Sequence, residues 1–311
     1  MLPEYNDLFS SENSDFSEIE KIRQKGRAKS RRGFLFSVLI EIFVVYFSVL
    51  LFKASHPFWS LVVFIVGTIL FLVIWISVNL SATKTLKIKL FNSILKKIGT
   101  DFTYADAKNY EEKINKDLHF FIPMPGSHVD DVFIGKVRDY ETIIADNNIQ
   151  SEAYGSIFGA FAKIQLKTGL PNIYIFPRNS AYQNLFKIEK NLMEVHFFDE
   201  NFNSSYVVLS VDVNAAFTIM KPSFIEYLIK INNTRRFIKI TADGIFVFSE
   251  SEVALFEIYL SKKITDKIVS KFYEQFRTQY NLLENLYTYI AFGLGSEEQN
   301  LDEVPPKPDE I

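Results

Sequence analysis

The sequence predicts a membrane α-helical hairpin followed by a cytoplasmic α+β domain with a mainly antiparallel sheet and a long C-terminal amphipathic helix. Three observations lead to this prediction: two apolar stretches near the N-terminus, short apolar runs between turn residues after Gly126, and a helical repeat of apolar residues that stops before Gly293. About 190 residues lie between the hairpin and the end of that helix, which is enough chain for one hydrophobic core.

Two stretches are long and apolar enough to cross a bilayer. Residues 34–52 number nineteen with one charge, Glu41, and residues 58–80 number twenty-three with none. A helix rises about 1.5 Å per residue and the hydrocarbon core is about 30 Å thick, so each stretch predicts a membrane helix. Residues 53–57 leave room only for a tight turn, which makes the helices antiparallel neighbours. A secretory signal peptide over 21–52 fits poorly, because no small-residue cleavage site follows it.

The flanking charges predict the orientation. The turn offers only Lys53 and His56, whereas both outer flanks are strongly basic. Basic residues mark the cytoplasmic side, so we expect a multi-pass cell-membrane protein with both termini in the cytoplasm. The basic residues are Lys21, Arg23, Lys25, Arg27, Lys29, Arg31 and Arg32 in a juxtamembrane arm over 21–33, and Lys84, Lys87, Lys89, Lys96 and Lys97 after the second stretch.

Glu41 lies near the middle of the first stretch, where a carboxylate costs about 2–3 kcal/mol. Counting outward from the turn brings it to the depth of Gly67 and Thr68 on the second helix. Gly67 would let the backbones approach, and Thr68 could donate a hydrogen bond to the carboxyl. We therefore predict an intramembrane polar contact that holds the hairpin or an oligomer together. The alternative is a proton or ion relay, which would require oligomerisation because neither stretch contains a second ionisable residue.

Residues 81–99 predict a basic amphipathic helix. The apolar residues recur at helical spacing, and lysines occupy the intervening positions. The helix can lie on the anionic inner leaflet with its lysines facing lipid, or it can pack on the domain that follows. The apolar positions are Leu90, Phe91, Ile94, Leu95 and Ile98; the predicted lipid-facing lysines are Lys84, Lys87, Lys89, Lys96 and Lys97.

Residues 100–290 predict the α+β domain. Thr103 and Asp106 resemble a capping box for a helix that ends before Pro123, and residues 123–126 predict a turn. A helix is expected over 223–232, and another over 265–290 that Gly293 and Gly295 end. Strands are expected over 131–137, 140–147, 157–166, 172–176, 192–198 and 206–211, with a hairpin of 237–241 and 244–249.

Both ends of the chain are predicted to be disordered tails. Residues 1–20 and 291–311 are rich in acidic residues, and the second segment carries Pro305, Pro306 and Pro308. Such segments have too little apolar surface to form a core.

No familiar catalytic or cofactor motif occurs in the sequence. It has no cysteine, P-loop, dinucleotide fingerprint, zincin helix or nucleophile elbow, so we assign no catalytic, cofactor-binding or metal-ligating residue. His128 with Asp130 and Asp131 is the only local cluster of metal-ligand types, and a solvated turn explains it better. The near-neutral formal charge of −3 argues against nucleic acid as a partner and leaves lipid for the basic segments.

Several short motifs resemble a known family. They are Asp131–Lys136, Ile157–Phe161 and Phe202–Val208, followed by Asp212, Ala216, Pro222 and Phe224. Their order resembles domain-of-unknown-function family 3137, bacterial membrane proteins with an N-terminal helical pair and a cytoplasmic domain. The resemblance covers about residues 30–260. Phe217 stands where the family tends to have arginine. The resemblance implies no established activity, but it implies a LemA-type membrane protein as a partner.

Three hypotheses for function follow. The first is a membrane-anchored binding or scaffolding protein at the inner leaflet, with membrane lipid, a membrane-associated protein or a second copy of the chain as partner. The second is an enzyme with a non-obvious site in the domain, which a concave pocket with convergent polar groups would favour. The third is an ion or proton pathway through an oligomerised hairpin.

Overall fold

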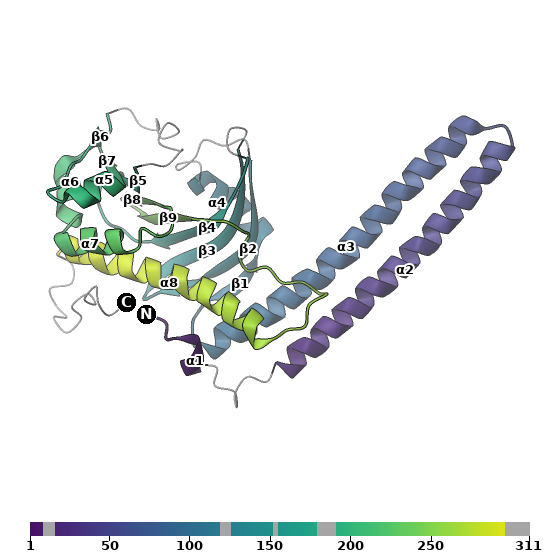
Figure 1. The fold of residues 1–311 in the computed structure, drawn as a ribbon, viewed down its shortest axis with the longest axis horizontal. Coiled ribbons are helices and arrows are strands. Elements are labelled where there is room, and N and C mark those ends of the chain that lie inside the picture. Colours follow the sequence, from purple (N-terminus) through teal and green to yellow (C-terminus); the bar gives the residue numbers. More distant parts are fainter. Residues whose placement is uncertain (9–15, 119–125, 152–154, 179–190, 296–311) are drawn as a thin grey trace. The chain divides into compact units, whose positions relative to one another are not determined.

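The computed structural model describes residues 1–8, 16–118, 126–151, 155–178 and 191–295. It contains two long apolar helices, then an antiparallel sheet with helices on it, and a long C-terminal helix (Figure 1), which confirms the predicted fold class. The chain forms two compact units. One comprises Met1–Leu8, Leu95–Glu257 and Lys271–Ile311, and the other comprises Phe9–Ile94 and Ile258–Ser270.

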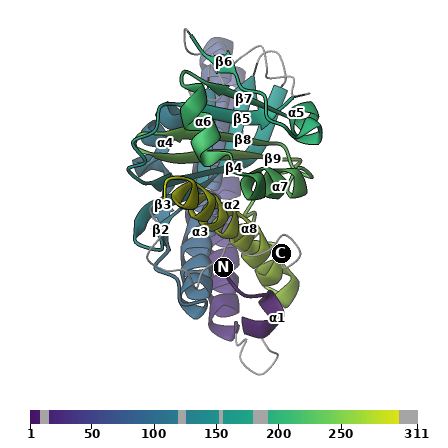
Figure 2. The same cartoon turned by 90° about the vertical axis from the view of Figure 1, so that its left-hand side faces the viewer.

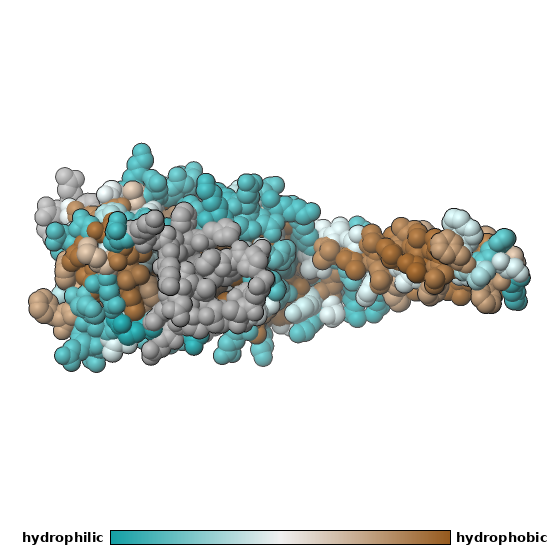
Figure 3. Space-filling view, turned by 90° about the horizontal axis from the view of Figure 1, so that it is seen from above, coloured by the Kyte–Doolittle hydropathy of each residue, from teal (hydrophilic) through white to brown (hydrophobic). Residues whose placement is uncertain are grey.

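The second unit is built on a helical hairpin of α2 (Ser17–Lys53) and α3 (Pro57–Lys97). Both helices are long and apolar enough to cross a membrane, and only 11% and 6% of their most apolar windows are buried. The core helix of a soluble protein would be mostly buried, whereas here apolar side chains form a continuous surface over most of the hairpin (Figure 3). The arm over 21–33 belongs to α2 and residues 81–97 belong to α3, so neither is a separate element.

The first unit is built on a nine-stranded antiparallel sheet in the order β1-β2-β3-β4-β9-β8-β5-β7-β6. Tight turns join β2 to β3, where Val137 pairs with Tyr140, and β8 to β9, where Thr241 pairs with Gly244 as predicted. The strands are β1 (Thr103–Asp106), β2 (Gly126–Val137), β3 (Tyr140–Ser151), β4 (Gly155–Gln165), β5 (Ile173–Pro177), β6 (Met193–Glu194), β7 (Tyr206–Ser210), β8 (Arg236–Thr241) and β9 (Gly244–Ser251).

The two faces of the sheet are covered by different helices (Figure 1, Figure 2). On one face, α8 (Asp266–Gly293) packs Phe272 and Phe276 against Phe133 of β2, at ring-centroid distances of 5.7 Å for both. On the other face, α4 (Glu111–Leu118) buries Ile114 and Leu118 in a cluster with residues such as Val132. Adjacent residues in a strand point to opposite faces, which is why Val132 and Phe133 serve different layers.

In the described residues, the first unit also contains four short helices. Asp212 caps α6 by accepting hydrogen bonds from the amides of Asn214 and Ala215, and Phe224 of α7 stacks on Tyr289 of α8 at 5.4 Å. The four helices are α1 (Tyr5–Leu8), α5 (Glu200–Ser205), α6 (Val213–Ile219) and α7 (Pro222–Lys230), and a 3-10 turn covers Ala107–Asn109.

The predicted capping box at Thr103 and Asp106 is wrong. These residues form edge strand β1, in which Thr103 pairs with Ile134, and the helix begins only at Glu111. The Asp106 carboxylate instead accepts from the Lys108 amide at 3.3 Å and caps the 3-10 turn. Pairing with β2, a partner distant in sequence, overrides the local helix signal.

The predicted strand over 192–198 shrinks to the two residues of β6. The Asn203 side chain bonds both the amide of Phe197, at 3.0 Å, and its carbonyl, at 2.6 Å. Those backbone groups are therefore not available to a ladder, and α5 starts directly after this segment. Helices α5 and α6 were not predicted. Residues 123–125 of the predicted turn and residues 296–311 of the predicted tail lie outside the described residues.

Residues 1–8, predicted to be part of a disordered tail, dock on α8. Leu2 is buried, its amide donates to Asn281 Oδ1 at 2.8 Å, and its carbonyl accepts from Arg277 Nε at 3.1 Å. The Tyr273 hydroxyl donates to the Pro3 carbonyl. An apolar anchor with both backbone groups bonded explains why this segment is ordered despite its acidic composition.

We expect Leu2→Asp to lower the Tm of the purified chain by about 5–10 °C, because a carboxylate would replace a buried apolar side chain. Thermal unfolding in detergent measures the change, with Asp7→Asn, an exposed substitution in the same segment, as the control. Equal Tm values for the two variants would show that the docking contributes no stability.

Candidate functional site

The structure brings together the three residues predicted to make the intramembrane contact. The Thr68 hydroxyl donates to Glu41 Oε1 at 2.9 Å. Gly67 lies directly against Val44 of α2, and a side chain at this position would collide with the Val44 methyl groups. A polar pair beside a close helix approach is the arrangement expected of a packing contact between apolar helices. Its role in assembly stays a prediction.

Other polar side chains of the hairpin also bond within it. Ser48 and Ser60 donate to each other's carbonyl oxygens at 2.8 and 2.7 Å, and Ser30 donates to Asn79 Oδ1 at 2.6 Å. Among the described residues, the buried Oε2 atom of Glu41 has no hydrogen-bond partner. Several polar side chains of the two helices are thus hydrogen-bonded across the hairpin, which is the pattern expected of helices that cross a hydrocarbon layer.

The lysines predicted to face lipid differ in exposure. Lys84, Lys89, Lys96 and Lys97 are exposed, whereas Lys87 is buried at 6% exposure and so does not face outward. Leu90, Phe91, Ile94 and Leu95 on the predicted apolar face are all fully buried. The predicted apolar face is therefore buried, and the contact of the exposed lysines with lipid stays a prediction.

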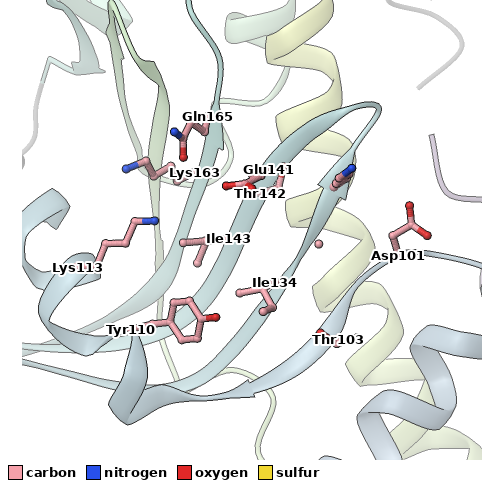
Figure 4. Close-up of a pocket in the computed structure, with 12 residues that line it drawn as sticks. Asp101, Thr103, Tyr110, Lys113, Ile134, Glu141, Thr142, Ile143, Lys163 and Gln165 are labelled. Atoms are coloured by element: carbon pink, nitrogen blue, oxygen red, sulfur yellow. The ribbon is translucent and has the colours of Figure 1, made fainter.

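A cleft opens on the face of the sheet that α4 partly covers (Figure 4). Its volume is about 520 Å³, within the range of small-molecule and peptide sites. Lys113 reaches into it from α4, while Lys163 and Gln165 come from β4. The other lining residues are Asp101, Thr103, Tyr110, Ile134, Gly135, Lys136, Glu141, Thr142 and Ile143.

Strand register determines the composition of the cleft. Thr103, Ile134, Ile143 and Lys163 are successive direct partners across β1 to β4, so their side chains share one face. Two residues further along β2, Lys136 pairs with Glu141 on the same face. The cleft therefore has an apolar floor of Ile134 and Ile143 and a rim of charges of both signs.

The charged side chains of the cleft are held to different degrees. Lys163 is fixed, because its ammonium lies 2.7 Å from Asp117 Oδ2 and 4.6 Å from the centre of the Phe246 ring. Within the described part of the chain, Lys113, Lys136 and Glu141 form no ion pair. These three side chains can therefore meet a ligand without breaking an existing contact.

The cleft does not present an activated nucleophile. The Thr142 hydroxyl donates to the Tyr140 carbonyl at 3.0 Å and accepts from the Val137 amide at 3.3 Å, so it braces the β2–β3 turn. Among the described residues, no histidine lines the cleft. The arrangement suits recognition of a ligand by charge and apolar contact rather than covalent chemistry.

The local cluster at His128 does not converge. The His128 side chain is 72% exposed, with Nδ1 3.5 Å from Glu111 Oε1, whereas Asp131 is buried and accepts a hydrogen bond from the Tyr104 hydroxyl at 2.7 Å. Burial and the charge of Asp131 raise the pKa of Tyr104, so this hydroxyl remains a donor. Within the described ranges, no three His, Asp or Glu side chains are placed to hold a metal ion.

The residues that carry the family resemblance serve structural roles. Asp131 anchors Tyr104, Asp212 caps α6, and Pro222 occupies the first turn of α7. Gly159 lies so close to Phe248 and the Ser249 carbonyl that no side chain fits there. Phe217, where the resemblance led us to expect an arginine, is exposed, and its ring lies 5.1 Å from the Phe197 ring.

The cleft was not predicted from the sequence. The pattern that could have indicated it is a charged residue two positions from an isoleucine in the same strand, as in Ile134 and Lys136, or Glu141 and Ile143. That pattern is also typical of a solvated strand face, and only the neighbouring α4 turns it into a cleft.

No curated protein matches the chain. Among solved structures, the crystal structure of the mycobacterial trehalose monomycolate transport factor A, TtfA, is 8% identical, with a TM-score of 0.40, over 67% of this chain and 95% of that one. Residues 157–288, from β4 into α8, match the model of the family described as protein of unknown function (DUF3137), and this match confirms the family resemblance.

Proposed function

We propose that the chain is a membrane-anchored binding protein. The hairpin of α2 and α3 spans the bilayer with both termini in the cytoplasm, and the α+β domain binds its partner at the inner leaflet. The observation that carries the binding role is the cleft between α4 and strands β1–β4, with its apolar floor and charged rim.

Two features support the anchor. The apolar windows of α2 and α3 are left uncovered, and the polar side chains within them bond across the hairpin, as between Thr68 and Glu41. The basic flanks and the short turn supply the orientation.

The chemistry of the cleft supports a ligand with an apolar centre and charged ends. Ile134 and Ile143 offer the apolar contact, while Lys113, Lys136 and Glu141 offer both signs of charge. A peptide segment with one apolar side chain between charged residues fits this description. The family resemblance adds a LemA-type membrane protein as the candidate source of such a segment, and a second copy of the chain is the other.

The topology can be tested with single cysteines because the chain has none of its own. We expect Ser55→Cys to react with a membrane-impermeant thiol reagent in intact cells, whereas Ser93→Cys and Ser156→Cys react only after the cells are permeabilised. Labelling at position 156 in sealed cells would refute the proposed orientation.

The contact between Glu41 and Thr68 predicts a coupling in the hairpin. Glu41→Gln retains a hydrogen-bonding group and should unfold like the parent chain in detergent, whereas Glu41→Leu should destabilise the hairpin by about 1 kcal/mol. Thr68→Val should have no further effect in the Glu41→Leu background, because the bond is already lost. Ile42→Leu, on an exposed face of α2, is the control. Additive effects of the two substitutions would contradict the contact.

The cleft can be tested by photocrosslinking in native membranes. A photoreactive residue in place of Lys136 should yield a defined crosslinked product, whereas one in place of Lys230, exposed on α7, should not. Thr103→Trp, which fills the cleft from edge strand β1, should remove the Lys136 product by competing with the ligand for the same space. A product that persists in the Thr103→Trp background would exclude the cleft as the binding site.

A further inference from the structure

A short segment between β9 and α8 is fastened to the base of the hairpin by one buried ion pair. Arg23 of α2 is only 5% exposed. Its Nη1 atom donates a hydrogen bond to the Leu260 carbonyl at 2.6 Å, and its Nε atom donates one to Glu20 Oε2 at 2.8 Å. Glu20 Oε2 also accepts from the Ile264 amide at 3.2 Å. Both ends of the segment 260–264 are thus bonded to the same pair of side chains.

The ion pair is charged at any physiological pH. The hydrogen bonds from Arg23 outweigh burial and lower the pKa of Glu20 to about 2. A depressed carboxylate pKa means that this contact stabilises the fold above the ordinary pKa of Glu and is lost only as pH falls towards 2. The contact therefore keeps both of its charges over the physiological pH range.

Small residues let the segment lie directly on the two helices. The Leu260 side chain approaches Gly26 so closely that a Cβ there would be 3.2 Å from Leu260 Cδ2, and the same Cβ would be 3.7 Å from Ala82 of α3. Leu260 therefore sits where α2 and α3 are close together. A larger residue at position 26 would push the segment away.

The side chains that project from this segment are aromatic and basic. Tyr259 is 50% exposed, Lys262 and Lys263 are exposed, and the Lys262 ammonium lies 5.0 Å from the centre of the Tyr259 ring. Tyrosine and lysine are the residues that favour the boundary between hydrocarbon and water. Because Arg23 already orders the segment, binding a headgroup would cost little conformational entropy.

The surroundings of the segment on α2 and α3 are strongly basic. Within the described residues around it, the acidic ones are Glu18, Glu20, Glu257 and Asp266, and Glu20 is neutralised by Arg23. Exposed basic residues are more numerous; they are Lys21, Lys25, Arg27, Lys29, Arg31, Arg32, Lys84, Lys89, Lys262, Lys263 and Lys267.

The segment also lies at the right depth. Gly26 precedes the apolar stretch at Phe34 by eight residues, about 12 Å along the helix, and Ala82 follows Leu80 by two, about 3 Å. The headgroup layer is about 5–8 Å thick, and charges act over about 8 Å at physiological ionic strength. Counted along either helix, the position of Leu260 is thus within about 12 Å of an apolar stretch, and Lys262 and Lys263 follow it by two and three residues.

We propose that residues 259–263 form a contact site for anionic phospholipid headgroups. Lys262 and Lys263 face the phosphates together with the basic residues of α2 and α3, and Tyr259 lies at the interface. This inference rests on the proposed membrane anchor. It adds to the lipid-binding surface a segment that follows the last strand of the sheet in the sequence.

The test uses the full chain with Ser261→Cys, labelled with a fluorophore and reconstituted into nanodiscs. The nanodiscs contain phosphatidylcholine alone or with phosphatidylserine, and a headgroup-attached quencher reports proximity. We expect stronger quenching in the anionic discs, falling as salt rises, because lysine attraction to lipid phosphate is screened. A label at Ser204→Cys, exposed on α5, measures the background.

Charge reversal separates a local site from a general charge effect. Lys262→Glu with Lys263→Glu should abolish the difference between anionic and neutral discs, whereas Lys108→Glu with Lys116→Glu, at two exposed positions in and next to α4, should leave it intact. Arg23→Gln, which frees the segment without removing a lysine from it, should weaken the difference.

Three outcomes would overturn the inference. Equal quenching in both kinds of disc would show that the segment does not contact anionic headgroups. Equal effects of the two double substitutions would show that the response depends only on the net charge of the protein. A chain that does not enter the discs would refute the proposed anchor, and this inference with it, whereas insertion without a lipid-dependent signal would refute the inference alone.

Discussion

The alternation of side chains along β2, β3 and β4 is the constraint on which the rest of the domain depends. Phe133 points to α8 and its neighbour Ile134 points to the cleft, so one strand supplies a core layer and a candidate binding surface at once. A register slip of one residue would exchange the two faces and expose the aromatic cluster. The tight turn between Val137 and Tyr140, braced by Thr142, fixes that register.

The second unit depends on a different constraint: polar side chains of α2 and α3 form hydrogen bonds with each other. Serine, threonine and glutamate side chains of α2 and α3 bond each other, so the outer surface of the apolar stretches is left to side chains such as Phe36 and Leu61. In the basic segments that flank these stretches, the outer surface is charged, and the buried ion pair between Glu20 and Arg23 holds the segment 260–264.

The family motifs and the cleft overlap only in part. Asp131, Gly159, Asp212 and Pro222 shape turns, caps and close contacts, so their role in this chain is to support the fold. Lys136, at the end of the first motif, is the exception because it reaches the cleft. Because a fold does not by itself prescribe function, the ligand depends on the residues that line the cleft.

The sequence alone determined the hairpin, eight of the nine described strands, with β6 much shorter than predicted, and the covering helix α8, because length, charge and periodicity of 2 or 3.6 residues are properties of local segments. It placed Glu41 beside Thr68 because depth in an antiparallel hairpin follows from counting. It missed β1, the docking of Leu2, the burial of Lys87, the fastened segment 260–264 and the cleft. Each of these depends on contacts between residues far apart in the chain, such as Thr103 with Ile134 or Arg23 with Leu260, and only the tertiary structure decides which distant partners meet.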